Sequence, residues 1–149
     1  MSAAETAHIA SARIDVSAAF ALEKLADPEA IGRWALGSMD LRETETPGLF
    51  RGVSLFDGSE TFVEISPQPE IGLVEYRVGG REARLPSISA RVISAEALGG
   101  AGESCLVALM AWRGWQVDEA RWSRTRESHG AEILLLKAQL ETSYAEQAR

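Results

Sequence analysis

DEARWSRTRESHGAEILLLKAQLETSY, residues 118–144, carries apolar side chains at the spacing of an α-helix. At 100° per residue, the side chains at positions 122, 126, 129, 133, 136, 140 and 144 fall within about 40° of one line along a helix. Apart from Arg126 and His129, these side chains are apolar or aromatic. Asp118 is a suitable N-cap, so we expect one helix of roughly 27 residues, about 40 Å long, that buries this ridge against another element.

Between residues 39 and 114 the pattern changes to short runs of period two separated by turn residues. These runs predict strands over 39–45, 49–56, 60–66, 73–78, 87–94 and 104–112, and a looser run predicts another over 8–15. Asp57-Gly58 marks a tight hairpin, and Pro67 is expected to end the third run because proline cannot donate to a sheet ladder. Strands joined by such short links are antiparallel neighbours.

The inward face of two runs can be identified from the sequence. Val74 and Tyr76 alternate with Glu75, and Ala90 is followed by Arg91. The apolar side of each run should therefore face the helix, and the charged side should face water. The run over 104–112 is apolar on both faces, so its inward side stays open.

Two short helices are expected after the first strand. Ser17 can cap a helix over 18–25, and Asp27 with Pro28 can begin a second one that runs to about Leu36 and ends at Gly37. The sequence thus predicts an α+β fold: a curved antiparallel sheet of about seven strands wrapped around a long C-terminal helix. We expect a single domain over 1–149, with a flexible terminus over 1–6.

Composition narrows the classes of function. The net charge of -7 and the pI of about 4.9 make nucleic acid an improbable partner, because the average field repels phosphate. No apolar stretch approaches the ~20 residues of a membrane span. The single cysteine, Cys105, cannot form an internal disulfide, which favours a cytoplasmic protein. His8, His129 and Cys105 show no metal-site spacing, so neither a metal nor a cofactor is expected.

Two surface features point outside the core. Four arginines, at positions 113, 121, 124 and 126, cluster near the start of the last helix, and they either bind a partner or pair with neighbouring acidic residues. Leu134 and Leu135 lie more than about 100° from the ridge, on the side that should meet water. These leucines either pack under the edge of another helix or form the contact of a homodimer.

The order of elements and one local motif resemble the START/Bet v 1-like (SRPBCC) superfamily, which includes polyketide cyclase/dehydrase and lipid-transfer proteins. The matching residues are Ala12-Arg13-Ile14-Asp15-Val16-Ser17, Phe20, Leu25-Ala26-Asp27-Pro28-Glu29 and Trp34. The turn at 16–19 lacks the prolines usual in the family. The resemblance implies that the helices close a cavity against the concave face of the sheet, and it does not choose among the family's functions.

The residues that we expect around such a cavity come mainly from the ridge and from the aromatic side chains. Arg126 and His129 could orient a carboxylate, enolate or phenolate, and His129 could act as an acid or base; alternatively, both are satisfied by ordinary structural contacts. The expected ligand-binding residues are Trp34, Tyr76, Trp112, Trp122, Arg126, His129, Ile133 and Leu136.

Three functions remain open on this sequence. The first is binding of a small apolar or amphipathic molecule, such as a lipid or a polyketide-like compound, in the internal cavity. The second is an enzyme, a cyclase or dehydratase acting by proton transfer, with His129 as the base and Arg126 stabilising an enolate. The third is a protein-interaction module that works through Leu134, Leu135 or the arginines and holds no small ligand.

Overall fold

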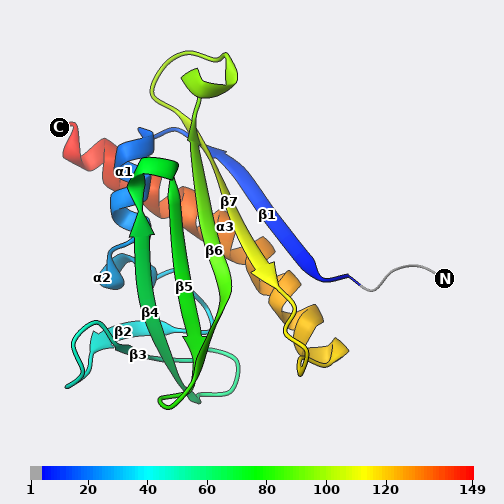
Figure 1. Ribbon diagram of the computed structural model, residues 1–149. Coiled ribbons are helices and arrows are strands. Elements are labelled where there is room, and N and C mark those ends of the chain that lie inside the picture. The colour runs from blue at the N-terminus through cyan, green and yellow to red at the C-terminus, as the bar shows by residue number, and fades with distance from the viewer. Residues whose placement is uncertain (1–4) are drawn as a thin grey trace.

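The computed structural model describes residues 5–149, in which seven antiparallel strands form one curved sheet around one long helix (Figure 1). The strand order is β1-β7-β6-β5-β4-β3-β2. The strands are β1 (Ala7–Ile14), β2 (Met39–Glu43), β3 (Phe50–Val53), β4 (Glu60–Gln68), β5 (Leu73–Gly79), β6 (Arg84–Ser94) and β7 (Cys105–Trp112). The α-helices are α1 (Ala18–Leu25), α2 (Pro28–Ile31) and α3 (Glu119–Gln147), and Pro69–Ile71 and Glu96–Leu98 form 3-10 turns. The predicted fold, a curved antiparallel sheet wrapped around a long C-terminal helix (a helix-grip fold), is confirmed. Most of the terminus that we expected to be flexible, residues 1–6, lies outside the described residues.

The ridge of α3 packs against the sheet as its periodicity predicts. Trp122, Ile133, Leu136 and Leu140 are each at most 5% exposed. Asp118 caps the helix by accepting a hydrogen bond from the Arg121 N–H (2.8 Å). In Figure 1, α3 passes behind β6 and β7. The helix therefore covers the concave face, and its apolar ridge forms the centre of the core.

Polar contacts fix α3 along the edge strand β1. The Lys137 ammonium donates to the carbonyl of Arg13 (2.7 Å), and the Glu141 carboxylate accepts from the backbone N–H of Asp15 (2.8 Å). The same two side chains, four residues apart, also form an ion pair. One flank of α3 is thus held against β1, and the other flank faces α2 and the opposite half of the sheet.

Both short helices begin where the sequence predicts, but α2 ends at Ile31 rather than near Leu36. In a continuing helix the carbonyl of Gly32 would accept from the N–H of Leu36. Here the Gly32 carbonyl accepts from Asp40 N–H instead (2.9 Å), and Leu36 N–H donates to the carboxylate of Glu132 (2.8 Å). Asp40 and Glu132 thus take the places of the two groups that would form this helical bond. The helix that we expected, running to about Leu36, is therefore too long.

Two prolines lie inside strands, contrary to the expectation that Pro67 ends β4. The pairing of β4 with β3 covers residues 60–63 and ends at Val63. Beyond it, β4 pairs with β5 alone, so the backbone around Pro67 has one free edge, where a missing N–H breaks no ladder bond. Pro86 lies in β6 at the register shift opposite Arg77, which is a bulge. Both positions are ones that tolerate proline in a sheet.

Candidate functional site

A cavity of about 730 Å³ lies beside the ridge of α3, between this helix, the α2–β2 segment and the sheet. Its floor comes from β4 to β7, is mainly apolar and includes Tyr76, and Trp34 lines it from the α2–β2 segment. The wall formed by α3 is polar. The apolar lining includes Ile31, Val63, Val78, Ile88 and Leu109, and α3 contributes Arg121, Thr125, Ser128, His129 and Glu132. This volume and this mixture are typical of small-molecule sites.

The polar wall has a simple helical origin. Arg121, Thr125, Ser128 and Glu132 are spaced by four, three and four residues, which places them on one stripe about 60–120° around from the ridge line. The ridge itself is pressed onto the sheet, so open space can exist only beside it. The α3 residues predicted from the sequence belong to the ridge, and none belongs to this stripe. The four-three-four spacing of the polar residues is the signal that would have identified the stripe.

Glu132 is the most informative residue of the wall, and it was not among the predicted site residues. It is 6% exposed, although glutamate is rarely buried without a partner. Its Oε2 atom accepts from the Leu36 N–H, and its Oε1 atom lies 3.8 Å from Nε2 of His129, beyond hydrogen-bonding distance. Within residues 5–149 no arginine or lysine forms an ion pair with this carboxylate. One oxygen therefore tethers the α2–β2 segment, and the other has no donor.

Burial shifts the two titratable groups of the site in opposite directions. Desolvation raises the pKa of Glu132 to about 7, although the Leu36 N–H partly offsets the shift. Desolvation, together with the nearby ring of His8, lowers the pKa of His129 to about 4. At neutral pH His129 is thus uncharged, and Glu132 changes its charge. Of the two groups, Glu132 is the one whose pKa lies near neutral pH.

Two other polar atoms at the site have no hydrogen-bond partner among the described residues. They are Nε1 of Trp34 and Nδ1 of His129, and both residues line the cavity. His8 Nδ1, on β1 behind His129, is in the same condition, with the two ring centroids 6.4 Å apart. A buried polar atom without a partner costs about 1–3 kcal/mol. The cavity therefore holds unmet hydrogen-bonding capacity.

Of the eight predicted ligand-binding residues, the structure brings three to the cavity: Trp34, Tyr76 and His129. The rings of Trp34 and Tyr76 meet edge to face, with centroids 6.4 Å apart. The Tyr76 hydroxyl donates to the carbonyl of Leu25, so this residue offers its ring to the cavity while its hydroxyl is engaged. Burial raises the pKa of Tyr76, which keeps it neutral.

The other predicted residues lie elsewhere. Trp112 is 53% exposed on the outer face, because Leu109 and Ala111 take the inward positions of β7 and the next residue must point outward. Trp122 is buried, with its indole N–H donating to Glu5 (3.1 Å). Arg126 pairs with Glu5 and Glu119, on the flank away from the cavity. Ile133 and Leu136 belong to the packed core.

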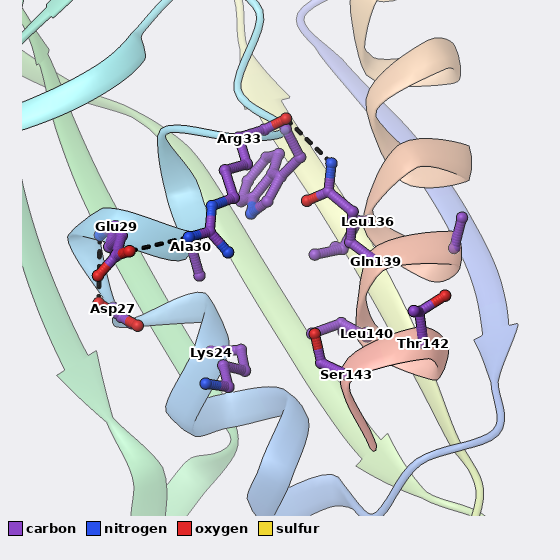
Figure 2. A pocket seen from close by; sticks show the side chains of 12 residues that line it. Lys24, Asp27, Glu29, Ala30, Arg33, Leu136, Gln139, Leu140, Thr142 and Ser143 are labelled. Atoms are coloured by element: carbon purple, nitrogen blue, oxygen red, sulfur yellow. Dashed lines mark hydrogen bonds and ion pairs between the residues drawn. The ribbon is translucent and has the colours of Figure 1, made fainter. Parts of the chain in front are cut away.

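A second hollow, of about 400 Å³, lies between α1, α2 and the C-terminal half of α3 (Figure 2). Several of its polar side chains pair with one another, and Trp34 lines this hollow as well as the cavity beside α3. Arg33 pairs with Glu29 (2.8 Å), Glu29 N–H donates to Asp27, and the Gln139 amide donates to the carbonyl of Arg33 (3.0 Å). Leu136 and Leu140 line it from α3. Because this groove carries paired polar groups, the cavity around Glu132 is the stronger candidate site.

The four arginines near the start of α3 divide between several roles. Arg113 and Arg126 both pair with Glu119, as the interpretation of a charged surface expects. Arg124 lies over the ring of Phe56 at the rim of the cavity, 5.0 Å from the ring centroid.

Cys105 is buried, and burial raises the pKa of its thiol, which disfavours the reactive thiolate.

Comparison with known proteins gives the fold and nothing narrower. No family model matches the chain, and no curated protein matches its sequence. Solved structures do match. The protein XoxI from Bacillus cereus is 12% identical with a TM-score of 0.69, over 97% of this chain and 99% of that one. The Zhui aromatase/cyclase from Streptomyces sp. R1128 is 14% identical with a TM-score of 0.66, over 96% and 95%.

A third similar structure is that of the Aha1 dimer from Colwellia psychrerythraea, 13% identical with a TM-score of 0.66 over 92% of this chain and 97% of that one. At such identities the likeness shows a common fold, the one found in polyketide aromatase/cyclase structures. None of the described helices is long and apolar enough to cross a membrane.

Proposed function

We propose that this protein binds a small, mainly apolar molecule in the cavity beside α3, with the polar end of the molecule at Glu132, His129 and Trp34. The observation that carries the proposal is the combination of an apolar floor with buried polar atoms that have no partner. A ligand that covers the floor is stabilised by about 25 cal/mol per Å² of apolar surface removed from water. The polar end would satisfy groups that are otherwise left unpaired.

The test is retention of ligands by the purified protein. Native mass spectrometry after incubation with fatty acids, sterols and aromatic polyketides should show a one-to-one adduct for at least one class. Ser128→Trp places a large side chain on the cavity wall and should abolish the adduct. Ala131→Trp, on the exposed side of the same helix, is the matched control and should leave it intact. Retention that is unchanged in Ser128→Trp would place the ligand elsewhere and overturn the proposal.

A second candidate function is a cyclase or dehydratase that moves a proton on a polyketide-like substrate. The observation that favours it is Glu132, a buried carboxyl at the cavity whose pKa of about 7 suits a general acid or base. His129, with a pKa of about 4, would then be a neutral hydrogen-bonding group. Once a substrate is known, Glu132→Gln should remove turnover while retaining binding. Full turnover in Glu132→Gln would exclude this mechanism.

A further inference from the structure

The charges around the cavity differ between its rim and its interior. The exposed part of the lining contains two arginines, Arg121 and Arg124, and two carboxylates, Asp57 and Glu60, so its formal charges balance and are screened by water. Inside, Glu132 is the one ionisable group of the described lining that carries charge at neutral pH, because Tyr76 and His129 are neutral there. The interior of the cavity is therefore neutral or negative, and never positive.

The hydrogen-bonding groups of the interior fit a hydroxyl better than a carboxylate. The Trp34 indole N–H can only donate, and it has no acceptor among residues 5–149. The hydrogen bond that Glu132 accepts within these residues uses Oε2 and leaves Oε1 open to a donor. A hydroxyl can accept from the first and donate to the second. A carboxylate can only accept, so it would leave Glu132 without a donor and bring a second negative charge into a buried site.

We infer that Glu132 determines which ligands the cavity accepts, and that the cavity takes an uncharged apolar molecule bearing an alcohol or phenol in preference to a carboxylate of the same skeleton. This inference rests on the proposed function and makes it narrower. It reverses the expectation from the sequence of an anionic ligand held by Arg126, since Arg126 points away from the cavity.

The preference has a defined dependence on pH. A carboxylate can enter only when Glu132 is protonated, and each pH unit above the pKa of Glu132 lowers that population about tenfold. A phenol, with a pKa near 10, stays neutral between pH 6 and 8 and is not affected in this way. The other titratable groups near Glu132 are His129 on α3, His8 on β1, Tyr76 on β5 and the four rim residues. Of these, His8 needs a control, because its ring lies 6.4 Å from that of His129, which lines the cavity.

The experiment measures the affinity of 2-naphthol and of 2-naphthoic acid by calorimetry at pH 6 and pH 8. For the wild type we expect the affinity for 2-naphthol to stay constant and the affinity for 2-naphthoic acid to fall about tenfold over this range. Glu132→Gln keeps an oxygen that accepts from the Leu36 N–H but removes the charge, so the fall should disappear. His8→Gln should retain it.

The outcomes distinguish failure of the selectivity role of Glu132 from failure of the proposed ligand binding. If both probes bind the wild type with the same pH dependence, or if Glu132→Gln still loses 2-naphthoic acid at pH 8, the selectivity role of Glu132 is wrong and the cavity remains a ligand site. If neither probe binds and the native mass spectra show no adduct of any class, the proposed function fails, and this inference fails with it. The wild-type comparison stands alone should the variant not fold.

Discussion

At the scale of single residues, Glu132 connects the fold to the candidate site. Its carboxylate accepts the hydrogen bond that the Leu36 N–H would donate to the Gly32 carbonyl in a longer α2. This contact holds the segment after α2, which lines one side of the cavity. The same carboxylate is buried beside a neutral histidine with no cation paired to it in residues 5–149. A group with such surroundings is expensive to keep ionised, and this makes it a functional candidate.

The pKa of Glu132 predicts how stability depends on pH. Because the pKa rises from 4.5 to about 7 on folding, the folded state binds more protons than the unfolded state between these pH values. The free energy of unfolding of the wild type, minus that of Glu132→Gln, should fall by roughly 3 kcal/mol as the pH rises from 4.5 to 7. Urea denaturation across this range measures the difference. A difference that stays constant with pH would contradict the shift.

His129 acts with the opposite sign over an overlapping range. Its pKa falls from 6.5 to about 4 on folding, so the unfolded state binds more protons and the stability due to this group rises with pH between those values. In the wild type the two slopes largely cancel. In Glu132→Gln the rise due to His129 should become visible, and in the double variant with His129→Gln it should vanish.

At the scale of elements, α3 has one position that its packing does not explain. Gly130 is exposed in the middle of the helix, and a Cβ atom built there would meet nothing within 4 Å. The structure therefore shows no close approach to the sheet at this glycine. Glycine inside a helix is less favourable than alanine by about 1 kcal/mol.

Gly130→Ala should therefore raise the free energy of unfolding by up to about 1 kcal/mol. Gly32→Ala is the control with the opposite sign, because its Cβ would lie 2.7 Å from the backbone nitrogen of Leu41. Both variants can be compared with the wild type by urea denaturation. Destabilisation by Gly130→Ala would mean that the middle of α3 needs glycine for a reason other than space.

The beginning of α3 depends on its cap. Asp118 accepts from Arg121 N–H at 2.8 Å, and it satisfies one of the unpaired N–H groups of the first turn. Asp118→Ala should lower the free energy of unfolding by about 1 kcal/mol, whereas Asp118→Asn, which also caps well, should change it little. Equal losses in the two variants, measured by thermal or urea denaturation, would show that the charge of Asp118 matters more than its hydrogen bond.

At the scale of the whole molecule, the outer side of α3 carries an exposed apolar surface. Leu134 and Leu135 are 65% and 38% exposed, as their place on the helix predicts. Self-association through these leucines remains a prediction, and neither leucine lines the cavity.

If the two leucines form a dimer contact, light scattering should give a mass near twice 16.1 kDa at high concentration and a lower mass on dilution. Leu135→Lys should then give the mass of one chain throughout, because it places a charge in an apolar contact. Gln147→Lys, at the C-terminal end of the same helix, changes the charge away from the leucines and should behave as the wild type does. A wild type that stays at 16.1 kDa would exclude the dimer.

The amino-acid sequence by itself determined the layers of this protein. Period-two runs identified the strands, and the 3.6-residue period of 118–144 identified the helix and the face that it buries, down to the Asp118 cap. These features can be predicted from short segments of sequence, because the period of the apolar residues in a segment indicates which of its faces is buried. The same reasoning left the two faces of β7 open, since both are apolar, and the pairing of β7 between β1 and β6 decided that Trp112 points outward.

The candidate site depends on contacts between residues that are far apart in the chain. Glu132 meets Leu36, which lies 96 residues away in the sequence. The burial that this packing gives Glu132 raises its pKa, and the hydrogen bond from Leu36 N–H offsets only part of that rise. A glutamate on the polar flank of a helix has the same local pattern whether it faces water or a cavity. The choice depends on how far the sheet curves away beside the ridge, and that distance is set by all the packed elements together.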